Sequence, residues 1–285
     1  MQARTLLKLG ALALASATLL LASAACRQRA VEPARAYLGF DRDEYPGDNA
    51  MLQLRKDFAF TGYWLGLPPG EKINPWQGKH EFLRSHGFGF LPLYLGPDSA
   101  QLKNSAAASA QGTRDAKAAA DSATREGFAH STILFLDIEE GGRLSLNYHA
   151  YLKAWSEELR RKGFKPGAYC SGMPVNEGHG ATITTAADIH NDPLTPDFAF
   201  WVYNDACPPS RGCEAPQSPR PPSASGIPYA QVWQFAQSPR RKQYTARCPV
   251  KYAHDGNCYA PADAGHKWFL DLNSAASPDP SGGRK

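Results

Sequence analysis

Short apolar runs recur along the chain, and each of them is too short for a buried helix. The clearest run spans residues 133–136 and is rich in β-branched and aromatic side chains. This pattern is typical of a strand that is covered on both faces, as in a parallel sheet. Similar runs occur both before and after it. The pattern therefore predicts eight strands, at residues 36–41, 58–65, 88–95, 133–136, 166–170, 198–203, 230–235 and 268–273.

Helical patterns fill several of the connections. Short helices are predicted at 49–56 and 76–86, and an alanine-rich one at 100–126 that Gly112 is expected to break. Ser145 is placed to cap a further helix that ends at Gly163. Its apolar residues recur at helical spacing, which predicts core packing: Tyr148, Leu152, Trp155 and Leu159.

The alternation of strands with helical or irregular connections defines the expected fold class. Eight strands over about 240 residues match a single α/β domain, a (β/α)8 TIM-type barrel, at residues 36–275. Two long Pro-rich loops, at 204–228 and 237–266, are expected at its rim. The active sites of such barrels lie at the carboxyl ends of the strands.

Acidic residues follow the fourth predicted strand. Asp137 and Glu139 are two positions apart, so on a strand their side chains point the same way, about 6–7 Å apart. Carboxylates are costly to desolvate unless they have partners or a task. The pattern predicts a general acid and its helper; the alternative is a strand that ends in a solvated acidic loop. Other polar or aromatic residues fall near predicted strand ends: Asp41, Tyr94, Tyr203 and Asp271.

The first 25 residues have the pattern of an export signal. Arg4 and Lys8 precede an apolar stretch at 9–21, which is too short and alanine-rich for a convincing membrane span. Cys26 follows a segment that resembles a bacterial lipoprotein cleavage site, although Ser23 stands where leucine is favoured. Lipid attachment at Cys26 and plain cleavage both remain open. Residues 26–35 would be a tether, and the mature protein would be exported to the periplasm or cell envelope.

The cysteines fit an oxidising compartment. Two pairs flank the Pro-rich loops and could form local disulfides, whereas Cys170 lies in an apolar strand and is expected to be a buried free thiol. No CxxC or HExxH spacing is present, so we expect no metal site. The candidate disulfide residues are Cys207, Cys213, Cys248 and Cys258.

The charge and the motifs of the chain argue against several classes of binding partner. The net charge is +4, and no long basic run with interleaved aromatic residues occurs, which argues against nucleic acid. No P-loop or dinucleotide-binding glycine pattern is present, and we expect no cofactor. Residues 276–285 are rich in Pro, Gly and Ser and are expected to be a disordered tail. We expect a monomer.

Five short motifs recur in an order that resembles a known family. They are G-F-D at 39–41, L-D-I-E at 136–139, G-A-Y at 167–169, V-W-Q-F at 232–235 and L-D-L-N at 270–273. Together they resemble the glycoside-hydrolase-like barrel family also called domain of unknown function 1906. That family is similar to the family 25 glycoside hydrolases, the lysozymes with an Asp-x-Glu motif. The resemblance covers roughly residues 36–275.

The resemblance implies roles for the acidic residues. Glu139 would donate a proton to the glycosidic oxygen, and Asp137 would orient a substrate N-acetyl group that attacks the anomeric carbon. Asp41 and Asp271 would line the same site. The configuration would be retained, and the substrate would be an N-acetylated polysaccharide, most simply peptidoglycan. Glu140 makes the motif D-x-E-E, which leaves the proton donor open by one position.

Two further questions stay open at this stage. Tyr94, Tyr203 and Trp233 could present flat faces to sugar rings, or could belong to the core. A fold also does not fix a function. The alternative to a glycosidase is therefore a non-catalytic, carbohydrate-binding envelope lipoprotein that kept the carboxylates.

Overall fold

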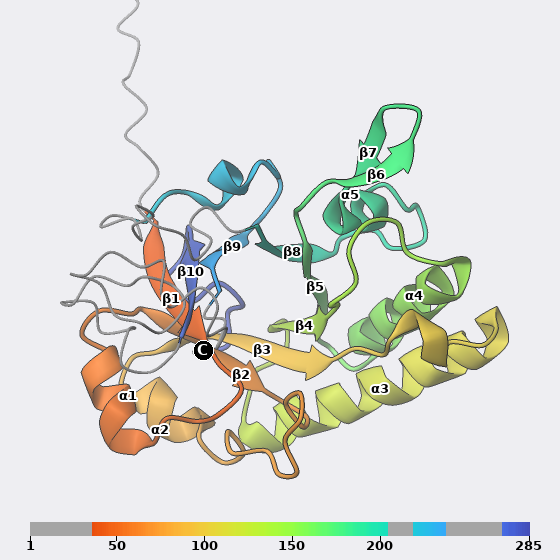
Figure 1. Ribbon diagram of the computed structural model, residues 1–285. Helices are drawn as coiled ribbons and strands as arrows, with labels where there is room; N and C mark the ends of the chain where they lie inside the picture. Colours follow the sequence, from red (N-terminus) through yellow and green to blue (C-terminus); the bar gives the residue numbers. More distant parts are fainter. Residues whose placement is uncertain (1–35, 205–218, 238–269) are drawn as a thin grey trace, which may run out of the picture. The chain divides into compact units, whose positions relative to one another are not determined.

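Eight strands close into a barrel in the computed structural model (Figure 1). The structure describes residues 36–204, 219–237 and 270–285. Every barrel strand overlaps one of the eight predicted runs, which confirms an α/β fold with a closed eight-stranded barrel. The strands are β1 (Tyr37–Asp41), β2 (Phe60–Trp64), β3 (Gly89–Leu95), β4 (Ile133–Asp137), β5 (Lys165–Ser171), β8 (Ala199–Tyr203), β9 (Val232–Ala236) and β10 (Asp271–Ala275).

The last strand departs from the regular (β/α)8 pattern. From β1 through β9 neighbouring barrel strands are parallel, whereas β10 is antiparallel to both of its neighbours, β1 and β9. It therefore begins at the rim where the other strands end. Asp271, its first residue, pairs with Asp41, the last residue of β1. The reversal brings the start of β10 to the edge where a barrel carries its active site.

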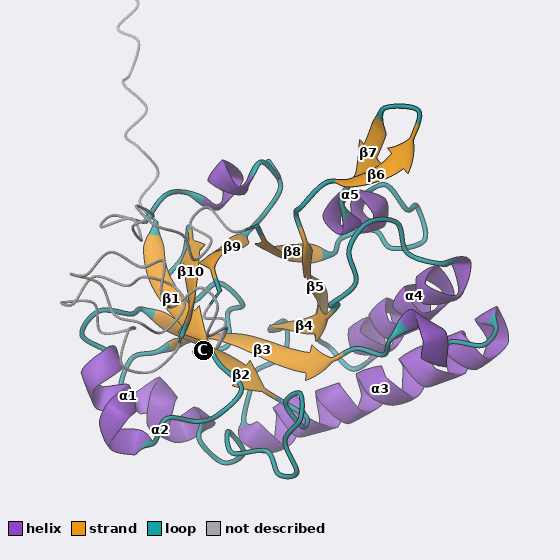
Figure 2. Ribbon diagram, in the orientation of Figure 1, coloured by secondary structure: helices purple, strands orange, loops and turns teal. Residues whose placement is uncertain are grey.

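Helices pack on the outside of the sheet, and α3 and α4 lie side by side (Figure 2). As predicted, the Ser145 hydroxyl accepts a hydrogen bond from the Tyr148 amide, 3.2 Å away, and so caps α4. The predicted stripe of α4 is buried. The helices are α1 (Asp48–Leu54), α2 (His80–Ser85), α3 (Ser105–Glu126), α4 (Leu146–Arg161) and α5 (Thr185–His190), with 3₁₀ turns at Ser99–Gln101 and Pro222–Ser225. A hairpin of β6 (Val175–Gly178) and β7 (Ala181–Ile183) precedes α5.

The predicted break at Gly112 is wrong, because α3 continues through this residue. Gly112 faces α4, where a Cβ would lie 2.4 Å from the Tyr151 carbonyl oxygen. A contact that close is possible only without a side chain. The glycine thus permits tight packing of α3 on α4 instead of ending the helix.

This packing predicts that Gly112→Ala destabilises the protein. Alanine favours a helix by about 1 kcal/mol over glycine, but here its methyl group must push the helices apart. We expect the free energy of unfolding to fall by about 1–3 kcal/mol, measured by denaturant titration. Thr113→Ala, at an exposed position of the same helix, should cause no loss. Equal stability of Gly112→Ala and the wild type would contradict the close approach.

The carboxyl-terminal residues 276–285, predicted to be disordered, are instead ordered against the amino ends of β3 and β4. The Phe90 amide donates to Asp279 Oδ1 over 3.1 Å, and the Ile133 amide donates to the Ser281 carbonyl over 3.0 Å. A Cβ at residue 89 would lie 2.1 Å from the Pro278 carbonyl oxygen, so β3 must begin with glycine. The tail supplies partners for backbone groups at these strand ends.

Several predictions lie outside the described residues: the signal segment 1–25, the tether 26–35 with Cys26, and all four cysteines of the two loops. Cys170 is a buried free thiol, as predicted, and burial raises its pKa. In the described part of the chain, no helix has the length and apolarity that crossing a bilayer requires.

Candidate active site

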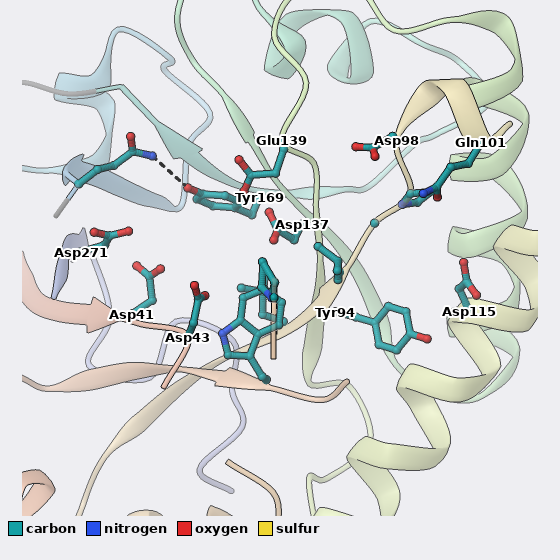
Figure 3. A pocket seen from close by; sticks show the side chains of 18 of the residues that line it. Asp41, Asp43, Tyr94, Asp98, Gln101, Asp115, Asp137, Glu139, Tyr169 and Asp271 are labelled. Carbon is teal, nitrogen blue, oxygen red and sulfur yellow. Dashed lines mark hydrogen bonds between the residues drawn. The ribbon is translucent and has the colours of Figure 1, made fainter. Parts of the chain in front are cut away.

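A cleft of about 1040 Å³ lies at the carboxyl ends of the parallel strands (Figure 3). The four acidic residues expected there all line it: Asp41, Asp137, Glu139 and Asp271. They come from β1, from β4 and the loop after it, and from the first position of β10. Figure 3 shows them grouped at one end of the cleft, which extends from there toward α3. The fold therefore assembles in space what the sequence spreads over 231 positions (41 to 271, counted inclusively).

Asp137 and Glu139 are neighbouring carboxyl groups that interact electrostatically in the cleft. Asp137 is only 3% exposed, whereas Glu139 reaches solvent. Burial, reinforced by the negative charge of Glu139, raises the pKa of Asp137 well above its usual range. The protonated form of Asp137 is thereby favoured over the ionised form. Within the described structure, Asp137 Oδ1 has no hydrogen-bond partner.

Asp41 is held by two amide groups. Asn273 Nδ2 and Gln234 Nε2 both donate to Asp41 Oδ1, over 2.6 and 2.9 Å. The orientation of each amide is fixed in turn, because Trp201 Nε1 donates to Asn273 Oδ1 and the Tyr169 hydroxyl donates to Gln234 Oε1, both over 2.8 Å. An indole N–H can only donate, so the Asn273 amide must present its nitrogen to Asp41. The network fixes the position of the Asp41 carboxyl group.

The environment of Asp41 changes its protonation. Burial raises its pKa to about 7, although the hydrogen bonds from Asn273 and Gln234 act in the opposite direction. The charges of Asp43 and Glu139 raise the pKa of Asp41 further. Asp41 thus titrates near neutrality, next to Asp137, whose pKa is also raised.

Glu140 is directed elsewhere, which bears on the D-x-E-E ambiguity. Its carboxylate accepts hydrogen bonds from the Ser99 amide and, over 2.5 Å, from the Ser99 hydroxyl. It is absent from the described lining of the cleft, whereas Glu139 is present. The two glutamates therefore differ in direction, as strand-like alternation predicts.

The three candidate sugar-binding aromatic residues differ in position. Tyr94 lines the cleft. Tyr203 is half-buried, and its hydroxyl donates to the Glu139 carbonyl over 3.3 Å. Trp233 is 2% exposed, and its Nε1 donates to the Asn204 carbonyl over 2.8 Å. Its burial agrees with the alternative of a core residue.

Sequence reasoning missed several residues of the cleft. Asp43 follows Asp41 by two positions but lies beyond the end of β1, and Tyr169 belongs to the G-A-Y motif. Asp98 and Asp115 come from the β3–α3 connection and from α3, which carried no signal of a site. The missed lining residues include Asp43, Trp64, Asp98, Gln101, Gln111, Asp115, Tyr169 and Gln237.

The charged residues that line the described part of the cleft are all acidic. Seven acidic residues and no lysine, arginine or histidine line this part of it: Asp41, Asp43, Asp98, Asp115, Asp137, Glu139 and Asp271. Despite these carboxylates, no three His, Cys, Asp or Glu side chains in the described ranges are arranged to hold a metal ion. The arrangement is suited to proton transfer between carboxyl groups and to binding an uncharged or cationic ligand.

Comparison with known proteins relates part of the chain to a known family. Residues 74–207 match the family described as Rv2525c-like, glycoside hydrolase-like domain. The predicted resemblance to a glycoside-hydrolase-like barrel family is thereby confirmed. No curated protein matches the chain.

Two solved structures share the fold, and a third is less similar. A protein of B. stearothermophilus is 20% identical with a TM-score of 0.54, over 84% of this chain and 95% of that one. The Tat-secreted protein Rv2525c of Mycobacterium tuberculosis is 14% identical with a TM-score of 0.50, over 86% and 97%. A glycosyl hydrolase 25 of Streptococcus pneumoniae is 10% identical with a TM-score of 0.46, over 83% and 86%.

Proposed function

We propose that the protein is an exported glycosidase that hydrolyses the glycosidic bonds of an N-acetylated cell-envelope glycan such as peptidoglycan. The observation that carries this proposal is the Asp137–Glu139 pair, a buried carboxyl group beside an exposed one on the lining of a cleft. Glycoside hydrolysis requires a proton for the leaving oxygen and stabilisation of a positively charged transition state. The pair supplies the proton, and the surrounding carboxylates favour the positive charge.

In the proposed mechanism Glu139 protonates the glycosidic oxygen while the bond from that oxygen to the anomeric carbon breaks. The carbonyl oxygen of the substrate N-acetyl group forms the new bond to this carbon. Asp137, whose Oδ1 has no partner among the described residues, accepts the N–H of that group and holds it in place. Water then opens the cyclic intermediate and returns a proton to Glu139, so the anomeric configuration is retained.

Asp41 and Asp271 support the pair in this scheme. The negative charge of Asp41 contributes to the raised pKa of Asp137, and thereby favours the protonated form of Asp137. Asp271 enters at the start of β10, beside Asp41. Tyr94 would contact a sugar ring toward α3.

The proposed site of action is the cell envelope. The basic residues and apolar stretch at the amino terminus support export, and Cys26 would carry a lipid anchor or follow the cleavage site. The similar protein Rv2525c is described as Tat-secreted. A lipid at Cys26 would hold the protein on a membrane close to peptidoglycan.

The test compares purified peptidoglycan with the same material after chemical de-N-acetylation. We expect soluble fragments from the first and at least about a 100-fold lower rate on the second, because the substrate has lost an intramolecular nucleophile. Equal rates on both would contradict substrate assistance. If neither peptidoglycan nor N-acetylated chitooligosaccharides are cleaved, the glycosidase proposal fails and the non-catalytic sugar-binding barrel replaces it.

A further inference from the structure

The loop that carries Glu139 contains two residues with high conformational freedom. It spans residues 138–145 and contains Gly141 and Gly142 directly after the two glutamates. Gly142 has a φ of +82°, a conformation that favours glycine. Glycine loses the most conformational freedom on folding, so a loop with two of them needs support from elsewhere if its glutamate is to stay in one place.

That support comes from α5. The buried Thr185 hydroxyl lies 3.0 Å from the Glu140 carbonyl oxygen and 2.9 Å from the Gly142 carbonyl oxygen, and donates to them. Asp188 Oδ2 accepts from the Leu144 amide over 2.9 Å. These contacts are made to backbone atoms of the loop before, within and after the glycine pair. They therefore fix the backbone conformation of the loop.

Asp188 is itself held by cationic and polar groups. Its side chain is 4% exposed, and Oδ1 accepts from Arg143 Nη1 over 3.1 Å. His149 of α4 lies between two carboxylates, with Nε2 2.9 Å from Asp188 Oδ2 and Nδ1 2.6 Å from Asp192 Oδ2. Charge-assisted hydrogen bonds of this kind are strong and directional.

The hairpin in front of α5 adds two contacts. Glu177 of β6 accepts two hydrogen bonds from Arg143, over 2.6 and 2.9 Å. Val175 covers Gly142, where a Cβ would lie 3.1 Å from the Val175 Cβ. The hairpin and α5 together form the β5–β8 connection (Figure 1), and this connection holds the loop at several separate points.

We propose that Asp188 and Thr185 are positioning residues for the proton donor, and that the β5–β8 connection acts as the support of the Glu139 loop. This inference rests on the proposed function for its catalytic consequence. Its structural part, the ordering of the loop by α5, is independent of that function. Neither residue lines the described cleft, so both act through the loop backbone.

The test compares Asp188→Asn with Asp192→Asn. Both changes remove one carboxylate that contacts His149, but only Asp188, within α5, bonds to the loop, whereas Asp192 lies just after α5. We expect amide hydrogen exchange at residues 140–144 to be at least about tenfold faster in Asp188→Asn than in Asp192→Asn. On a cleavable glycan we expect kcat to fall by about 10- to 100-fold only in Asp188→Asn, with KM changed less than about threefold.

A second pair of variants, at Thr185, tests the inference even if Asp188→Asn does not fold. Thr185→Ser keeps the hydroxyl and should behave as the wild type, whereas Thr185→Val removes it and should speed exchange of the same amides. Equal exchange in the two variants of either pair would overturn the inference. If the wild type cleaves no glycan, the exchange comparison still decides whether α5 orders the loop, and only the proposed function fails.

Discussion

Replacing Glu139 with glutamine is expected to lower the rate of glycan hydrolysis by about 10²- to 10⁴-fold, the contribution of a general acid. Glutamine preserves the size of the side chain but has no proton to give to the leaving oxygen. Glutamine can still contact Asp137, so the fold and the affinity for the glycan should change little. The measurement is the release of soluble fragments from purified peptidoglycan, together with binding of an N-acetylated oligosaccharide.

Glu140→Gln is the matched control, because it changes the neighbouring glutamate in the same way. The Glu140 carboxylate is bonded to Ser99 outside the described lining of the cleft, and glutamine can still accept one of these bonds. This variant should keep most of the activity. A larger loss in Glu140→Gln than in Glu139→Gln would show that the proton donor is the other residue of the D-x-E-E motif.

Asp41→Asn is expected to make the protein more stable at pH 8 while it lowers activity. The pKa of Asp41 is raised by burial to about 7 in the folded protein, against about 3.9 in an unfolded chain. The folded state therefore binds the proton more tightly, and the free energy of unfolding contributed by this group decreases as pH rises from about 4 through about 7. Above that range an ionised Asp41 costs on the order of 2–4 kcal/mol.

Asparagine avoids this cost because it stays neutral and keeps an oxygen for Asn273 and Gln234. Thermal and denaturant unfolding at pH 4 and pH 8 provide the check. The gain in stability should be largest at pH 8 and small at pH 4, where Asp41 is protonated in the folded protein and about half protonated in the unfolded chain. The same gain at both pH values would mean that ionisation of Asp41 is not its source.

The strand order and the candidate carboxyl groups were predictable from sequence for a physical reason. Parallel strands end at one edge of a barrel, so acidic residues at the ends of apolar runs, such as Asp41 and Asp137, must meet there. The direction of β10 was not predictable. An apolar run reads the same for a parallel and an antiparallel strand, and only pairing with β1 and β9 reveals which it is.

Local composition misled where tertiary contacts dominate. Gly112 and the tail 276–285 have the composition of a helix breaker and of a disordered segment. In the fold, Gly112 packs against the Tyr151 carbonyl, and the tail forms hydrogen bonds with backbone groups at the strand ends of the barrel. Neither partner is near in sequence, so no local pattern records the contact.

The supporting groups of the site were hidden for a related reason. Gln234 and Asn273 belong to two of the sequence motifs, but the motifs do not indicate that they bind Asp41. Their amide groups are oriented for this by Trp201 and Tyr169, which lie on other strands. The hairpin and α5 gave no periodic signal, because both are short and the hairpin is also largely exposed. The carboxyl groups of the site can be predicted from the ends of the strands, whereas the residues that hold these groups in place can be recognised only in the folded barrel.

The pairing of β1 with β10 has a consequence for folding. Asp41 and Asn273 are joined by a hydrogen bond, yet 232 positions separate them in the chain. Contacts of such high sequence separation form late, since loop closure must be completed before they contribute. During synthesis the site would stay incomplete until β10 emerges from the ribosome, so a chain that ends before β10 would lack the proposed hydrolytic activity even if it retained Asp137 and Glu139.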